Sequence, residues 1–193
     1  MTTDDLQARL VAIIQANPDL MSVLRVVRGL DLPDWRIFSG AVYQAVWNAQ
    51  TGRPAGHGIK DYDLGYFDAS DIGWDAEDAV IRRVAAAFEE PFKSQVEVRN
   101  QARVHLWFKD RFGEDYDALP NTDAALARFV APAFAVGVRL EADDAISVVA
   151  PFGLRDVFDM VIRPNPDRPL AKGWTRTIDN ARGRWPEIKV VQP

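Results

Sequence analysis

The sequence predicts an α/β fold of the α+β kind, in which a small mixed sheet is flanked by helices. Apolar stripes with helical spacing recur along the chain, short β-branched and aromatic runs lie between them, and residues 61–67 alternate in polarity as a strand does. The chain has 193 residues, of which 48% are hydrophobic and 26% charged, and this is enough for one substantial core. We therefore expect one domain over residues 1–193, with N-terminal helices over residues 3–30 and a basic C-terminal helical segment over residues 163–193 packed on it.

The first quarter of the chain is predicted to be mostly helical. Apolar side chains spaced three and four residues apart predict helices over residues 3–17 and 18–30. Residues 35–38 are rich in β-branched and aromatic side chains and predict a short strand. A third helix is expected over residues 41–50, so a strand leads directly into a helix.

The connection between that strand and that helix is the turn Ser39-Gly40-Ala41. A helix start offers free backbone N–H groups and a positive dipole end to an anion. This pattern is a weak signal alone, because most turns of this kind only connect two elements.

The central stretch of the sequence is the strand predicted over residues 61–67. Side chains alternate between the two faces of a strand, so three apolar side chains share one face while Asp61 and Asp63 lie on the other. Residues 95–99 also alternate and look like the neighbouring strand, which would bring Glu97 beside the two aspartates. Carboxylates on an exposed strand face are equally compatible with simple solvation.

The remainder of the chain continues the alternation of helices and strands. Helices are predicted over residues 74–88, 102–112, 122–130, 154–161 and 172–185, a hairpin over 136–140 and 145–149, and a last strand over 188–191.

The balance of charge restricts the class of partner. The net charge is −5, whereas proteins that bind nucleic acid usually carry a basic surface, so a polynucleotide substrate is not expected. Residues 163–189 are an exception, with seven Lys and Arg against three acidic residues, which leaves −9 for the rest of the chain. This segment could meet phosphates, but a solvated or internally paired surface is the favoured interpretation.

The composition also bears on compartment and chemistry. The chain has no Cys, which excludes disulfides, a thiol nucleophile and thiolate metal sites. The first residues are acidic where a signal peptide would be basic, and no apolar run approaches the length needed to cross a membrane. We expect a cytoplasmic protein that does not contact a membrane.

Three carboxylates on one sheet surface suit a hard cation. Mg²⁺ prefers carboxylate oxygens, with substrate phosphates and waters completing its octahedron. Asp61, Asp63 and Glu97 are therefore predicted as metal ligands and catalytic residues, with Mn²⁺ as the alternative to Mg²⁺. Metals held in this way bridge triphosphate oxygens and activate an attacking hydroxyl.

The order of these features resembles the nucleotidyltransferase superfamily of DNA polymerase β type. Members of that superfamily show a strand ending in a glycine turn, a strand with Asp-x-Asp, and a third carboxylate on a later strand. Gly40 matches the turn, Asp61 and Asp63 match the pair, and Glu97 matches the third acid. The resemblance implies a nucleotidyltransferase-like sheet and an NTP as substrate.

The chain resembles more closely a bacterial family of uncharacterised, predicted nucleotidyltransferases. The segments that carry this likeness are residues 38–48, 60–68, 96–107 and 150–156, within a match over residues 20–190. Ala41 stands where the superfamily has Ser or Gly, and the interval from Gly40 to Asp61 is longer than usual. A hydroxyl contact to phosphate is therefore absent at residue 41.

The resulting prediction is a metal-dependent nucleotidyltransferase that moves a nucleotidyl group from an NTP to an unidentified small acceptor. The residues expected to contact the nucleotide are Ser39, Gly40, Ala41, Lys60, Arg99 and Asn100. Arg99 and Asn100 could equally cap the helix predicted after them. The alternatives are a catalytically inactive nucleotide-binding or interaction module on the same fold and, less favoured, a metal-dependent phosphodiester hydrolase. The sequence gives no oligomeric state.

Overall fold

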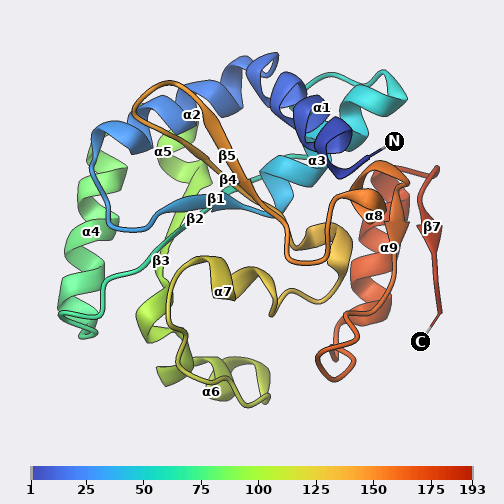
Figure 1. Ribbon diagram of the computed structural model, residues 1–193. Coiled ribbons are helices and arrows are strands. Elements are labelled where there is room, and N and C mark those ends of the chain that lie inside the picture. The colour runs from blue at the N-terminus through green and yellow to red at the C-terminus, as the bar shows by residue number, and fades with distance from the viewer. Residues whose placement is uncertain (1, 193) are drawn as a thin grey trace.

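A computed structural model describes residues 2–192 and shows a five-stranded mixed sheet flanked by helices (Figure 1). In chain order the elements are α1 (Thr3–Gln15), α2 (Pro18–Gly29), β1 (Arg36–Phe38), α3 (Gly40–Thr51), β2 (Tyr62–Tyr66), α4 (Trp74–Ala86), α5 (Phe92–Gln95), β3 (Val96–Asn100), η1 (Gln101–Leu106), α6 (Phe108–Phe112), α7 (Asp123–Leu126), η2 (Pro132–Phe134), β4 (Gly137–Leu140), β5 (Ile146–Val149), α8 (Arg155–Phe158), β6 (Val161–Ile162), α9 (Trp174–Arg184) and β7 (Lys189–Val190). The predicted fold class is confirmed.

The strand order of the main sheet is β3-β2-β1-β4-β5. β1 pairs antiparallel with both β2 and β4, and β4 and β5 form the predicted hairpin. β2 and β3 are parallel, since the chain crosses from one to the other through α4 and α5. The pairing of the strand with two aspartates and the strand with Glu97 is thus confirmed, with Asp63 directly beside Glu97.

One face of the sheet is buried under helices. Ile37, Leu64, Val98 and Val138 are register neighbours on this face, and each is at most 2% exposed. Helices α2, α3 and α4 contact the strands, and α1 packs on α3. This face holds the main core, because most of the side chains it presents are apolar and removed from water.

The opposite face carries a different set of side chains. Phe38, Asp63 and Glu97 lie side by side across β1, β2 and β3. Only a small apolar cluster covers the β1 end, formed by Phe38 with Ala125 and Leu126 of α7. This face is the one on which the functional residues were predicted.

Two predicted helices are shorter or differently wound than expected. Residues 102–112 form the 3-10 helix η1 and then α6, with a break at Trp107, whose φ of −129° is not helical. α7 ends at Leu126, although helical spacing predicts a helix to residue 130. The Asn165 side chain donates to the carbonyl oxygens of Ala127 and Phe129 at 2.8 and 2.7 Å, so these groups bond to the C-terminal segment instead.

The C-terminal segment packs on α3. Trp185, at the end of α9, is fully buried against Trp47, with ring centroids 5.3 Å apart, and donates from Nε1 to Asn48 Oδ1 at 2.9 Å. The short strands β6 and β7 form a second, parallel sheet there, and β6 lies where a helix to residue 161 was predicted.

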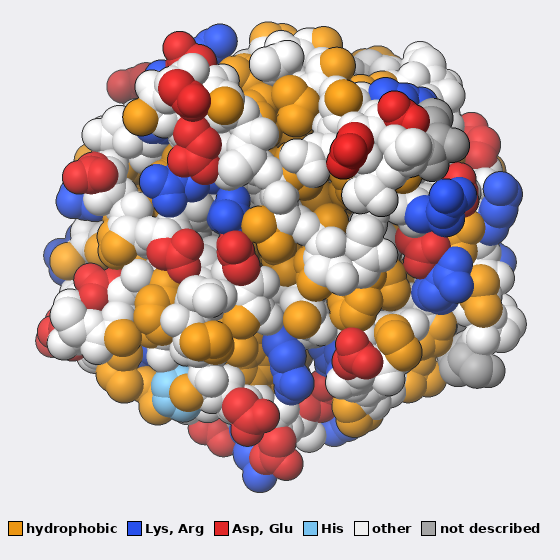
Figure 2. Space-filling view, viewed as in Figure 1, with side chains coloured by type: hydrophobic (Ala, Val, Ile, Leu, Met, Phe, Trp, Pro, Cys, Tyr) orange, Lys and Arg blue, Asp and Glu red, His pale blue; other side chains and the backbone are white. Residues whose placement is uncertain are grey.

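Among residues 2–192 no single helix is long and apolar enough to cross a membrane; α1 and α2 meet that test only as a pair, and they bend by 90° at their junction. Figure 2 shows acidic and basic side chains interspersed with hydrophobic ones over the face in view.

Candidate active site

The turn between β1 and α3 is held in an unusual conformation. Ser39 has φ 47° and ψ −105°, a region that non-glycine residues rarely occupy. Its N–H donates to Val136 O at 2.8 Å, and its carbonyl oxygen accepts from the N–H groups of Val42 and Tyr43 at 2.9 Å. Backbone strain of this kind persists where surrounding bonds impose it and is concentrated at functional sites. No side chain within residues 2–192 caps the start of α3.

Gly40 is the first residue of α3 and lies against the first aspartate. A Cβ at Gly40 would be 3.9 Å from Asp61 Oδ1 and 3.4 Å from Gln44 Nε2. Glycine therefore leaves open the space between the helix start and the carboxylate. The predicted anion site and the predicted acids are brought together here.

Two of the three predicted acids lie on neighbouring strands, and the third comes just before one of them. Asp61 immediately precedes β2, Asp63 is its second residue, and Glu97 lies beside Asp63 on β3. The side chains do not form a finished metal site, since no group of three His, Asp or Glu in residues 2–192 is arranged to hold an ion. Glu97 is instead paired loosely with Arg99, at 3.9 Å, and its side chain is 55% exposed.

Asp61, Asp63 and Glu97, here called the acid row, carry more negative charge than the cations around them offset. Burial, then the carboxylates of Asp61 and Glu97, raise the pKa of Asp63 to about 7, while Arg99 acts in the opposite direction. A carboxyl whose pKa is raised by neighbouring carboxylates lacks sufficient positive charge around it. A divalent cation would supply that charge, and three carboxylates are the oxygen donors that Mg²⁺ prefers. The donor set therefore fits a magnesium site.

A further polar side chain beside the acids was not predicted. Gln44, one turn after Gly40, is 6% exposed, and its Oε1 is buried without a partner among the described residues. Its Nε2 donates to Tyr43 Oη at 3.1 Å. Burial, with smaller contributions from Asp63 and Asp61, raises the pKa of Tyr43, so this hydroxyl stays protonated. A lone Gln inside a helix carries no sequence signal, because its position beside the turn depends on the fold.

The remaining residues predicted to contact the nucleotide differ in how accessible their side chains are. Lys60 is exposed next to Asp61, and Arg99 lines a cavity together with Asp63 and Glu97. The Ala41 side chain is fully buried, so only its backbone could meet a ligand.

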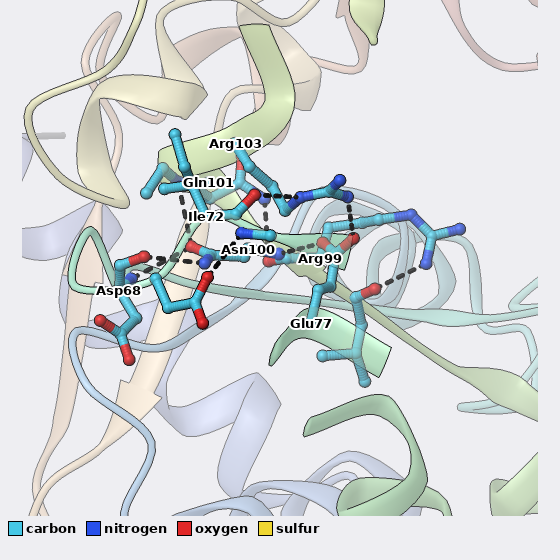
Figure 3. A network of polar contacts seen from close by, with 11 residues as sticks. Asp68, Ile72, Glu77, Arg99, Asn100, Gln101 and Arg103 are labelled. Carbon is cyan, nitrogen blue, oxygen red and sulfur yellow. Dashed lines mark hydrogen bonds and ion pairs between the residues drawn. The ribbon is translucent and has the colours of Figure 1, made fainter. Parts of the chain in front are cut away.

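Asn100 lies in a buried polar network (Figure 3) and is 1% exposed. Its side-chain oxygen accepts from the N–H groups of Asp68 and Ala102, each at 3.1 Å, and its side-chain nitrogen donates to Asp68 O at 2.8 Å. Its own N–H donates to Glu77, which is also ion-paired with Arg103. These bonds fix the end of β3 to the loop after β2, so we do not retain Asn100 among the proposed nucleotide contacts.

A cavity of about 510 Å³ opens beside the acids on the same face of the sheet. Its wall includes aromatic residues from the junction of η1 and α6, from α6 and from the following loop, and cations from the segment before α9 and from the first turn of α9. The basic segment over residues 163–189 was interpreted as a solvated or paired surface. Arg168 is indeed ion-paired, with Glu114, and Lys172 and Arg176 are exposed, but all three also lie on the cavity wall.

Comparison with known proteins addresses the fold and the family. No curated protein matched the chain. A solved structure described as a CCA-adding enzyme head domain has the same fold, with a TM-score of 0.76, 19% sequence identity and 95% of each chain covered. Residues 25–190, most of the chain, match the protein family described as Nucleotidyltransferase. This chain therefore belongs to the nucleotidyltransferase family.

Proposed function

We propose that the protein transfers a nucleotidyl group from an NTP to a small acceptor in a Mg²⁺-dependent reaction, with Mn²⁺ as an alternative ion. The observation that carries this proposal is the row formed by Asp61, just before β2, Asp63 on β2 and Glu97 on β3, beside the start of α3 at Gly40. Phosphoryl transfer depends mainly on positioning and on charge stabilisation, and this arrangement offers both.

The acids would hold the ion, with Asp61 and Asp63 as its first ligands and Glu97 completing the set. The raised pKa of Asp63 and the unpartnered oxygen of Gln44 support a site that is completed by a ligand. When bound, Mg²⁺ would neutralise phosphate charge and make an acceptor hydroxyl more acidic.

The start of α3 would seat the triphosphate. Backbone N–H groups at a helix N-terminus favour anions, and the strained turn at Ser39 fixes their direction. Lys60, next to Asp61, and Arg99, beside Glu97 on the cavity wall, would contact phosphate oxygens. Ala41 would contribute only its backbone.

The reaction itself would be an in-line displacement at the α-phosphorus. The acceptor oxygen forms a bond to that phosphorus, the bond to the bridging oxygen breaks, and pyrophosphate leaves with the electron pair. Glu97, which faces solvent at the side of the row, would take the acceptor's proton.

Calorimetry with the four NTPs, with and without Mg²⁺ or Mn²⁺, tests this proposal. We expect metal-dependent binding of at least one NTP to the wild-type protein. Asp61→Asn/Asp63→Asn should weaken it by roughly a hundredfold or more, since the protein loses the charges that hold the ion.

The matched control is Asp159→Asn/Asp179→Asn, which removes two exposed carboxylates elsewhere. Its affinity should stay within about twofold of wild type, a difference well under 1 kcal/mol. If the Asp61/Asp63 variant bound Mg·NTP as well as the control did, the acids would not be the ion's ligands and the proposal would fail.

A further inference from the structure

The cavity lies on one side of the acid row and the glycine turn on the other. Asp63 and Glu97 form part of the cavity wall, whereas Asp61 and Gly40 do not. From Asp63 the cavity follows β2 to Gly65, away from the start of α3. A molecule in the cavity would therefore approach the acids from the side opposite to the proposed triphosphate seat.

The far end of the cavity is strongly basic. Four cations line it (Arg128, Arg168, Lys172 and Arg176) against one carboxylate, Glu114. Arg168 uses its terminal nitrogens in an ion pair with Glu114 and a 2.6 Å bond to Arg128 O. Its side chain is only 8% exposed, yet its Nε has no partner among the described residues, and the same is true of Arg128 Nε.

The other two cations are free to meet a ligand. Lys172 and Arg176 are exposed, and neither has a hydrogen-bond or ion-pair partner within residues 2–192. They flank the start of α9, an 11-residue helix that follows Gly173 and is capped by no side chain of the described residues. Gly173 also lines the cavity, so the positive end of α9 adds to the basic end.

Aromatic rings form the wall between this basic end and the acids. Phe108 lies 4.4 Å from Tyr116 and 4.7 Å from Phe112, measured between ring centroids, and Trp107 adjoins them at 6.1 Å. The guanidinium of Arg128 lies 5.1 Å from the centroid of Tyr116. Ring faces of this kind bind planar apolar groups, and a cavity of about 510 Å³ has the size of a small-molecule site.

We propose that this cavity is the acceptor subsite and that it takes a small phosphate monoester with an aromatic body. The aromatic body would lie along the rings of residues 107–116, and the dianionic phosphate would sit among Arg128, Arg168, Lys172 and Arg176. The acceptor hydroxyl would then point toward Glu97 and Asp63. This assignment rests on the proposed function, because it takes the acid row as the place of reaction.

The test uses 1-naphthyl phosphate as the probe. Its binding is measured by calorimetry and by Trp fluorescence, since Trp107 lines the cavity. We expect it to bind at least about tenfold more tightly than 1-naphthol, 1-naphthoate or inorganic phosphate, each of which lacks part of the recognised chemistry. Lys172→Glu/Arg176→Glu should weaken that binding by about tenfold or more, because it places two negative charges beside the phosphate.

Arg182→Glu/Lys189→Glu is the matched control, since it makes the same charge change at exposed positions of the same C-terminal segment that do not line the cavity. It should retain wild-type affinity for the probe. Equal weakening by both pairs would show a general charge effect and overturn the assignment, as would equal affinity for 1-naphthol or no binding of any probe.

Competition with Mg·NTP separates this inference from the proposed function. Probe and Mg·NTP should bind together, each changing the other's affinity by less than about threefold. Mutual exclusion would make the cavity part of the NTP site and overturn the acceptor assignment. Probe binding that persists in Asp61→Asn/Asp63→Asn supports a separate subsite. A wild-type protein that binds the probe but no Mg·NTP would refute the proposed function alone and leave a phosphate-ester site standing.

Discussion

The two faces of the central sheet differ in packing and in charge. On one face Ile37, Leu64 and Val98 are almost fully removed from water under helices. On the other, one residue along each strand, Phe38, Asp63 and Glu97 border a cavity. The first face stabilises the fold by burying apolar area, whereas the second keeps charge and open space at the expense of stability. Truncating a side chain on the first face should therefore destabilise the fold strongly, whereas neutralising Asp63 on the second should stabilise it.

The largest effect is expected on the packed face. Leu64→Ala would remove a side chain that is 1% exposed and leave a cavity between β2 and the helices. We expect it to lower the free energy of unfolding by about 2–5 kcal/mol, the usual range for a buried Leu. Urea denaturation followed by circular dichroism measures this.

Leu119→Ala provides the comparison on the other face, where Leu119 is only partly buried against the small cluster at α7. This substitution should lower the free energy of unfolding by about 1 kcal/mol, because it removes less buried apolar area than Leu64→Ala does. Equal costs for the two variants would contradict the assignment of the main core to one face.

A second prediction concerns Asp63. Its pKa is about 7 in the folded protein and 3.8 in a model compound, so the folded state binds the proton more tightly. This group's contribution to stability is present below pH 4, falls as the pH rises toward 7 and is lost above it. Asp63→Asn should therefore stabilise the apoprotein at pH 8, by on the order of 2–4 kcal/mol at most.

Denaturation curves of Asp63→Asn and wild type at pH 4 and pH 8 check the sign. The two proteins should differ much less at pH 4, where the aspartate is largely protonated when folded. Asp159→Asn, at an exposed position, should show no such pH dependence. A variant less stable than wild type at pH 8 would show that Asp63 is not held in an unfavourable charged state.

The acid row also shows how far the sequence could predict the site. Alternation along residues 61–67 and 95–99 is a local pattern, and it predicted both the pairing of β2 with β3 and the faces on which Asp63 and Glu97 lie. These predictions need no knowledge of distant packing, because strand geometry fixes the side-chain directions. The predicted roles of Asp61, Asp63 and Glu97 as metal ligands stay predictions.

The cavity could not be predicted in the same way. Most of its rings come from residues 107–116 and most of its cations from residues 128–176, and only tertiary packing brings them together. The charge of the C-terminal segment was visible, but composition does not say whether a basic segment faces solvent or a cavity. Asn100 illustrates the opposite case: its side chain caps η1, which was the alternative to a nucleotide contact, and it is held in a buried network.

A third prediction addresses the ion. At pH 8, Mg²⁺ should raise the melting temperature of the wild-type protein, since it neutralises repulsion within the acid row. At a concentration ten times its Kd, it would add about 1.4 kcal/mol to the free energy of unfolding. Differential scanning fluorimetry with MgCl₂, against NaCl at equal ionic strength, measures this. Asp61→Asn/Asp63→Asn should show no shift, and an unchanged shift in that variant would place the ion elsewhere.

The smallest effect on stability, with a clear effect on binding, is expected at the glycine turn. Gly40→Ala adds a methyl group 3.9 Å from Asp61 Oδ1 and 3.4 Å from Gln44 Nε2, which are ordinary contact distances. The stability should therefore change by less than about 1 kcal/mol, as is usual for a Gly to Ala change in a compatible conformation. The methyl would nevertheless fill the space between the start of α3 and the acids, so the affinity for Mg·NTP should fall by about tenfold.

Gly29→Ala is the control, because a Cβ there meets nothing within 4 Å. If both variants bound Mg·NTP equally well, the triphosphate would not lie against the turn, and the open face would owe its nucleotide affinity to the acids alone.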